Sequence, residues 1–222
     1  MKAVAYTEAG TLRADALVDI ELDKPTPGPQ DLLIKVAAIS VNPVDAKIRS
    51  KRPATVDEPQ VIGWDAVGEV VAVGAKVQDF AVGDRVFYAG ALDRPGSNAE
   101  YQLVDARIVG HAPESLSDAE AAALPLTAIT AWELLFDRLG VAEGSGAGQT
   151  LLVIGAAGGV GSILVQLARQ LTELTVVGTA AREESAEWAK ELGAHHVIDH
   201  SKPMLAQLKA LGIESVELIA SL

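Results

Sequence analysis

The stretch "TLLVIGAAGGVGSILVQLARQL", residues 150–171, constrains the fold more than any other part of the chain. The apolar run at 150–154 predicts a buried strand, and apolar residues at helical spacing over 159–171 predict a helix directly after it. The residues between these two segments have almost no side chains. The order predicts a strand, a tight turn and a helix.

Small residues in such a turn are typical of an anion site, because a ligand phosphate can reach backbone N–H groups at the positive end of the helix dipole. The spacing is Ala156-x-Gly158-x-x-Gly161, with alanine at the first position of the usual G-x-G-x-x-G pattern. We predict that the pyrophosphate of a dinucleotide binds here. The alternative is a tight turn that only packs the helix on the strand. The predicted binding residues are Ala156, Gly158, Gly159, Val160 and Gly161.

The elements that follow alternate between strand and helix. Strands are expected at 150–154, 174–178 and 215–220, and helices at 159–171, 183–192 and 204–211. This order predicts an α/β domain with a doubly wound parallel sheet, the first half of a Rossmann fold. The segment 215–220 is expected to be its third strand, which would leave the first strand at an uncovered edge of the sheet.

The first half of the chain predicts short strands separated by turns rich in proline and glycine, such as 25–29 and 82–84. This pattern favours a β-rich, barrel-like domain. Ser117, followed three residues later by Glu120, forms a capping box at the start of a helical region. We therefore predict a first domain over 1–125 and a cofactor domain over 126–222.

The composition excludes several classes of partner and site. A net charge of −12 disfavours nucleic acid and anionic membranes as partners. The longest apolar stretch, 150–171, is interrupted by glycines and carries Gln166 and Arg169, so it does not predict a membrane span. The chain has no cysteine, which excludes a disulfide framework and a four-thiolate zinc site. Its first residues lack the apolar core of a signal peptide, and we expect a cytoplasmic protein.

The end of the second predicted strand bears on cofactor choice. An NAD site places an acid there for the ribose 2′-hydroxyl, whereas this chain reads Gly178-Thr179-Ala180-Ala181-Arg182. An arginine suits a 2′-phosphate, because its planar guanidinium can make two parallel hydrogen bonds. We predict that NADPH is preferred and that Thr179 and Arg182 lie at its site. The alternative is that Arg182 is a solvated residue that opens a helix.

Five stretches, taken together and in order, carry a family resemblance: "LLIKVAAISVNPVDAKIRS", "VIGWDAVGEVVAVG", "FAVGDRVFYAG", "LPLTAITAWELLF" and "LLVIGAAGGVGSILVQLAR". The chain resembles the medium-chain dehydrogenase/reductase superfamily, in its zinc-free quinone oxidoreductase branch. The resemblance implies a GroES-like catalytic domain, a Rossmann cofactor domain, a site in the cleft between them, and a homodimer. It also implies that the 222 residues are a C-terminally truncated fragment with weak cofactor binding and slow or no turnover.

The same resemblance indicates whether the chain has the ligands of a catalytic zinc ion. Zinc-dependent members of the superfamily hold the catalytic metal through a cysteine in the segment matching "SVNPVD" and through a Gly-His-Glu motif. This chain has Asn42 at the cysteine position and Gly63-Trp64-Asp65 in place of the motif. Its four histidines show no ligand spacing. We predict that no metal is bound.

Without a Lewis acid, conjugated acceptors are easier to reduce than simple ketones, because the charge spreads onto an oxygen that hydrogen-bond donors can hold. By the resemblance, Asn42 is the first candidate donor, with Asp45 in the same wall. The resemblance also places Thr127 against the nicotinamide and His200 near the adenosine phosphate. The alternatives are a capped turn at "NPVD", an interior threonine and a surface histidine.

The sequence therefore predicts an NADPH-dependent reductase that transfers a hydride to a quinone or an α,β-unsaturated carbonyl without a metal. Two alternatives remain. One is an NADPH-binding protein with little turnover. The other is a zinc-type alcohol dehydrogenase, which the substitutions at the ligand positions disfavour.

Overall fold

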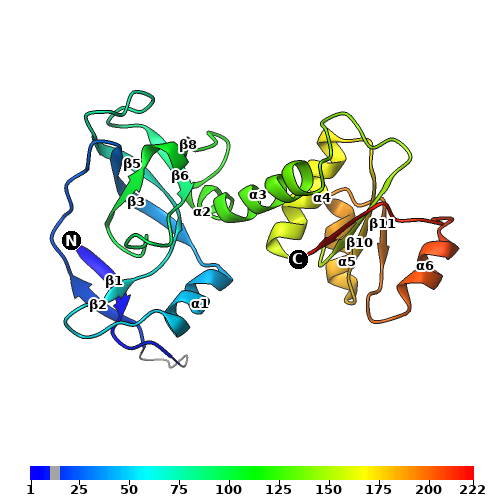
Figure 1. Ribbon diagram of the computed structural model, residues 1–222, viewed down its shortest axis with the longest axis horizontal. Coiled ribbons are helices and arrows are strands. Elements are labelled where there is room, and N and C mark those ends of the chain that lie inside the picture. Colours follow the sequence, from blue (N-terminus) through cyan, green and yellow to red (C-terminus); the bar gives the residue numbers. More distant parts are fainter. Residues whose placement is uncertain (11–15) are drawn as a thin grey trace. The chain divides into compact units, whose positions relative to one another are not determined.

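The computed structural model describes residues 1–10 and 16–222. These residues form two compact units, Met1–Leu126 and Thr127–Leu222. The division falls within helix α3 (Pro125–Trp132), which Figure 1 shows in green. Each unit has its own sheets and its own hydrophobic core.

The first unit is built on a five-stranded antiparallel sheet in the order β7-β3-β5-β6-β8. A second, three-stranded sheet has the order β2-β1-β4. Alternate residues of β3 and β5, such as Leu32, Ile34 and Val70, point into one core together with Val86 and Val104. The strands are β1 (Lys2–Tyr6), β2 (Val18–Glu21), β3 (Asp31–Ser40), β4 (Gln60–Val61), β5 (Asp65–Val73), β6 (Arg85–Ala89), β7 (Tyr101–Asp105) and β8 (Val109–His111).

These sheets correct one detail of the sequence prediction. The β-rich character of the unit is confirmed, but its strands do not close into a barrel within the described residues. The five-stranded sheet ends at β7 on one side and β8 on the other. Alternation and turn residues predict strands, whereas closure depends on long-range pairing that no local pattern encodes.

Short helices join and cover the strands of the first unit. Helix α1 (Pro43–Lys51) follows β3, with proline at its first position, where the missing N–H is not needed. Helix α2 (Asp118–Ala122) begins at the predicted capping box, which is confirmed: Ser117 Oγ accepts from the Glu120 N–H, and the Glu120 carboxylate accepts from the Ser117 N–H. A 3₁₀ turn, η1 (Ala106–Ile108), joins β7 to β8.

The second unit contains a four-stranded parallel sheet in the order β11-β10-β9-β12. The strands are β9 (Thr150–Ile154), β10 (Thr175–Thr179), β11 (His196–Ile198) and β12 (Leu218–Ser221). Helices α4 (Gly159–Leu171), α5 (Glu183–Glu191) and α6 (Met204–Ala210) connect them in turn. The predicted α/β class and Rossmann-like arrangement are confirmed.

Helices cover both faces of this sheet, because successive strand residues point to opposite sides. Leu151 and Val153 pack in one cluster with Leu164 of α4 and Ala189 of α5. Leu152, Val177 and Ile198 pack in another cluster with Leu208 of α6. Among the described residues, no helix has both the length and the apolar character needed to cross a lipid bilayer.

The last strand corrects a second prediction. The segment near the end of the chain was expected to be strand three, with the first strand left at an open edge. Instead β11, only three residues long, is the third strand and pairs with β10. β12 is the fourth strand and pairs with β9 on its other side, so β9 lies inside the sheet. The sequence reasoning was wrong here because so short a strand leaves no clear alternating pattern.

Candidate functional sites

The glycine turn between β9 and α4 is the first candidate site. Gly155 has a φ of +84°, a conformation that L side chains rarely adopt. A Cβ added at Gly161 would overlap the carbonyl oxygen of Gly155 and lie 2.8 Å from the Cα of Ala156. Gly161 therefore lets α4 approach the turn directly, as the alternative of a tight turn that packs the helix on the strand also requires.

The first turn of α4 presents unused hydrogen-bond donors. Its first closed bond is from the Ser162 N–H to the Gly158 carbonyl, at 2.8 Å. The N–H groups of Gly159, Val160 and Gly161 come before that bond and have no acceptor among the described residues. Three such donors at the N-terminus of a 13-residue helix can hold an anion.

The carboxyl ends of β10 and β11 lie at the same edge of the sheet as this turn, because the strands are parallel. Thr179, at the end of β10, is buried, and its hydroxyl accepts from the Gly155 N–H at 3.2 Å. This bond fastens the glycine turn to the neighbouring strand. Arg182 is exposed and lies just before α5, and His200 is exposed and follows β11.

Thr127 lies close to this turn. A Cβ added at Gly159 would meet the methyl group of Thr127 at 3.2 Å. Thr127 belongs to α3, which continues as a π-helical segment, η2 (Glu133–Arg138). The structure therefore brings together all the residues predicted from the second domain near one edge of the sheet, while their contacts with a cofactor stay predictions.

The second candidate site lies in the first unit, where β3 ends and β5 begins. The antiparallel register pairs Ser40 of β3 with Asp65 of β5, so Asn42, two residues beyond Ser40, can reach Asp65. Asn42 Nδ2 donates to Asp65 Oδ2 at 2.9 Å. The Leu126 N–H donates to the other oxygen, Oδ1, at 3.0 Å. Asp65 is completely buried, and Asn42 is half-buried.

Asp45 contributes to the same corner through the backbone. Its Oδ2 accepts from the Asn42 N–H at 2.6 Å, and its own N–H donates to the Asn42 carbonyl at 3.0 Å. These bonds fix the start of α1 and support the interpretation of "NPVD" as a capped turn. The second oxygen of Asp45, Oδ1, is buried without a hydrogen-bond partner among the described residues.

The environment of Asp65 favours its neutral form. Burial and, to a smaller extent, the neighbouring Asp45 carboxylate outweigh the lowering effect of the hydrogen bonds from Asn42 and Leu126, and the pKa of the Asp65 carboxyl is raised from 3.8 to about 6. A carboxyl group that titrates near neutral pH is typical of functional sites. No arginine or lysine among the described residues forms an ion pair with it.

The residues at the zinc-ligand positions do not fit a metal. Asn42 turns its amide nitrogen, a donor, toward Asp65. Trp64 is buried beside Tyr6 and Ile62, and its indole N–H donates to the Ala91 carbonyl at 3.0 Å. Within the described residues, no three His, Cys, Asp or Glu side chains form a group that could hold a metal ion. We derive no step through a metal.

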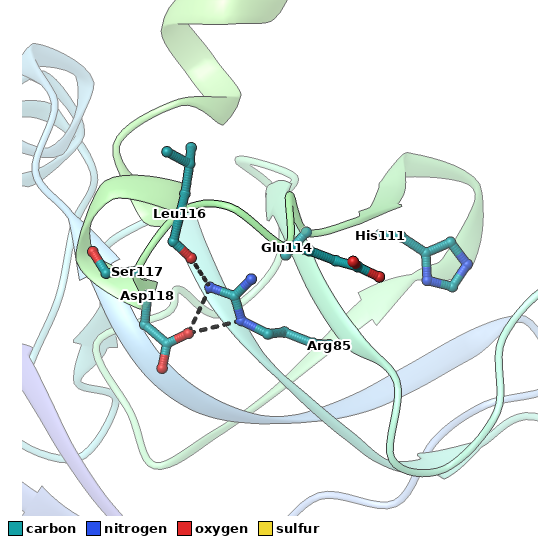
Figure 2. A pocket seen from close by; sticks show the side chains of 7 residues that line it. Arg85, His111, Glu114, Leu116, Ser117 and Asp118 are labelled. Atoms are coloured by element: carbon teal, nitrogen blue, oxygen red, sulfur yellow. Dashed lines mark hydrogen bonds and ion pairs between the residues drawn. The ribbon is translucent and has the colours of Figure 1, made fainter.

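A cavity of about 720 Å³ beside Arg85 lies elsewhere in the first unit. Figure 2 shows the Arg85 guanidinium bonded to Asp118 and to the Leu116 carbonyl, and it also donates to the Pro113 carbonyl at 2.8 Å. Its donors serve to fasten the loop ahead of α2. The cavity brings no predicted site residue together, and we do not assign it a function.

The sequence reasoning missed the importance of Asp65. It noted the residue only as a replacement in the Gly-His-Glu motif. The available signal was one of two carboxylates, Asp65 and Glu69, in the otherwise apolar run "VIGWDAVGEVVAV", because an acid that is buried there needs hydrogen-bond partners. The identity of those partners depends on the β3–β5 register, which the sequence does not specify.

Comparison with known families identifies both halves of the chain. Residues 28–114 match the alcohol dehydrogenase GroES-like domain, and residues 159–220 match the zinc-binding dehydrogenase family. The chain spans about 65% of the length of the curated Staphylococcus aureus relatives that it matches.

Three relatives illustrate the range of the similarity. A crystal structure of a putative zinc-dependent alcohol dehydrogenase from Rhizobium etli is 55% identical, with a TM-score of 0.92 over all of this chain and 65% of its own. The chloroplastic NADPH-dependent alkenal/one oxidoreductase of Arabidopsis thaliana is 38% identical over 94% of this chain and 54% of its own. The Escherichia coli quinone oxidoreductase, solved with NADPH, is 28% identical, with a TM-score of 0.82 over 97% of this chain and 64% of its own.

Proposed function

Given that this chain belongs to the medium-chain dehydrogenase/reductase superfamily, we propose that the protein is an NADPH-dependent reductase of quinones or α,β-unsaturated carbonyl compounds. Two of its relatives, the plant alkenal/one oxidoreductase and the bacterial quinone oxidoreductase, carry these activities in their names. We also propose that the protein is cytoplasmic and that it forms a homodimer.

The observation that carries the proposal is the set of free donors at the glycine turn. The N–H groups of Gly159, Val160 and Gly161 would hold the pyrophosphate, since they lack other acceptors among the described residues. Thr179 would keep the turn in place through its bond to Gly155. Arg182 and His200, exposed at the same edge, would hold the 2′-phosphate that distinguishes NADPH from NADH.

The acceptor would be recognised by the first unit. When bound, NADPH supplies two electrons as a hydride and is left as NADP⁺. An acceptor reduced at its β-carbon would carry negative charge on its carbonyl oxygen until a proton from water completed the reduction. Asn42 keeps one amide N–H that is not used by Asp65, and this N–H would donate to the oxygen where charge develops.

Steady-state oxidation of NADPH, followed at its absorbance band, tests the proposal on the 222-residue chain and on a longer form made by extending it to the length of its relatives. The acceptors are 1,4-benzoquinone and trans-2-hexenal, with ethanol and NADP⁺ as the comparison for alcohol oxidation. We expect turnover with the conjugated acceptors in at least the longer form. NADPH binding without turnover of either acceptor would identify a binding protein instead, and zinc-dependent ethanol oxidation would identify an alcohol dehydrogenase.

A further inference from the structure

Asp65 is a buried carboxylate that stability alone does not explain. It is completely buried, and no described lysine or arginine forms an ion pair with it. Burial of a charge without a paired cation opposes folding, and hydrogen bonds offset only part of that cost. Its position at the first residue of β5, between Ser40 of β3 and Ala89 of β6, is one where an apolar residue would otherwise be expected.

The two carboxylate oxygens of Asp65 accept hydrogen bonds from two different segments of the chain. Oδ1 accepts from the Leu126 N–H in the first turn of α3, and Oδ2 accepts from the side chain of Asn42. An ionised carboxylate can only accept hydrogen bonds. Asn42 must therefore turn its amide nitrogen toward Asp65, which directs its amide oxygen and its second N–H away from Asp65.

The backbone of Asn42 is also held in place by hydrogen bonds. Its backbone N–H donates to Asp45 Oδ2 at 2.6 Å, and its carbonyl accepts from the Asp45 N–H at 3.0 Å. With the backbone fixed by Asp45, the remaining freedom is the rotation of the amide, which exchanges its oxygen and nitrogen. The contact with Asp65 selects the orientation in which the amide nitrogen faces the carboxylate, and the Asn42 side chain also takes part in the capping box with the Asp45 N–H.

We propose that Asp65 is a positioning residue that fixes the orientation of the Asn42 amide, so that one N–H always faces the bound acceptor. This inference rests on the proposed function, in which Asn42 donates to the oxygen of a quinone or an unsaturated carbonyl. Asp65 itself touches neither acceptor nor cofactor.

The substitution Asp65→Asn separates positioning from a merely structural role. The amide oxygen of the new residue can still accept from the Leu126 N–H, so the start of α3 keeps its bond. Its NH₂ group then faces Asn42, which is expected to rotate and offer its oxygen instead. Ser97→Ala is the matched control, because the Ser97 hydroxyl donates to the backbone carbonyl of Asp65, at 3.4 Å, and not to its carboxylate.

The first readout needs no turnover. In ¹⁵N-resolved NMR spectra of the 222-residue chain, the Asn42 side-chain NH₂ signals, assigned by their loss in Asn42→Ala, should be protected from exchange in the wild type and in Ser97→Ala. In Asp65→Asn they should shift and lose protection. Asn42 signals that are the same in all three proteins would overturn the inference, whatever the activity of the chain.

The second readout uses the chain extended to the length of its relatives, with NADPH and trans-2-hexenal. Asp65→Asn should lower kcat about 100-fold, as expected for a misdirected oxyanion donor, while the NADPH Kd stays within about twofold because the glycine turn is untouched. An unchanged kcat would overturn the inference. A wild type with no turnover would instead refute the proposed function, and the NMR readout alone would then decide the role of Asp65.

Discussion

The two proposed sites, the glycine turn after β9 and the Asn42–Asp65 corner, lie in different parts of the chain. At the turn, the groups proposed to bind are backbone N–H donors, and Gly155 and Gly161 matter for the side chains they lack. At the corner, the groups proposed to act are side chains, and the backbone sets their spacing through the β3–β5 register. A substitution that adds a side chain is therefore expected to damage the glycine turn, whereas a substitution that exchanges an oxygen for a nitrogen is expected to damage the Asn42–Asp65 corner.

The largest expected effect tests the first half of this comparison. In Gly161→Ala, the new methyl group would overlap the Gly155 carbonyl and the Ala156 backbone, neither of which can move without shifting the turn. We expect a loss of about 3 kcal/mol in the free energy of unfolding, at the upper end of the cost of overpacking. Urea denaturation measures it.

Gly158→Ala is the matched control for that substitution. Gly158 has an ordinary φ of −76°, and a Cβ there would meet only the Gly155 carbonyl, at 3.3 Å. This variant should stay close to wild-type stability while it weakens NADPH binding, because the methyl group projects where the phosphates approach. Equal stability losses in the two variants would remove the distinction between packing and binding at the turn.

The second prediction concerns the pH dependence of stability at the corner. The folded-state pKa of Asp65 is raised from 3.8 to about 6, so its contribution to stability is present below about pH 4 and is lost as pH rises through 6. The shift of about two pKa units corresponds to about 3 kcal/mol at most. Asp45 is the charged neighbour that contributes to the shift.

The Asp65→Asn variant isolates this contribution, because asparagine does not titrate. Its free energy of unfolding relative to wild type should improve steadily between pH 4 and pH 7, and other carboxyl groups cancel in the difference. Chemical denaturation of both proteins at several pH values measures it. A difference that does not depend on pH would mean that Asp65 titrates normally.

The third prediction has a smaller expected effect and concerns Arg182, a side chain at the same sheet edge as the glycine turn. Removal of the guanidinium in Arg182→Ala should weaken NADPH binding by about 2 kcal/mol and NADH binding much less, because only NADPH carries a 2′-phosphate. Fluorescence titration with both cofactors measures this. Arg169→Ala, which removes another exposed arginine at the far end of α4, is the charge-matched control. Equal effects on both cofactors would remove Arg182 from the site.

The last prediction is that removal of metal ions has no effect on the protein. The family resemblance aligns Asn42 and Trp64 with the zinc-ligand positions of zinc-dependent dehydrogenases, and each side chain donates one hydrogen bond from its nitrogen. Treatment with a chelator should therefore leave stability and NADPH binding unchanged, and elemental analysis should find no stoichiometric zinc. Activity that disappears with the chelator and returns with zinc would contradict this.

The two sites also differ in how far they could be predicted. The glycine turn is encoded within about ten consecutive residues, so strand, turn and helix followed from spacing alone. The order of the sheet was less accessible, because β11 has three residues and β12 is recognised as strand four only through its pairing with β9. The Asn42–Asp65 bond joins residues 23 positions apart, and it exists only because Ser40 is paired with Asp65. The alternating pattern determines which face of the sheet each side chain takes, but it does not say which residue of a strand distant in the sequence lies opposite.

The uncompensated burial of Asp65 has a consequence for any directed evolution of this protein. A library selected only for heat resistance at neutral pH should favour replacements of Asp65 early, because the ionised form opposes folding under those conditions. Selection for turnover should restore it. The residue found at position 65 would then show whether a lineage had been selected for heat resistance or for turnover, without any assay.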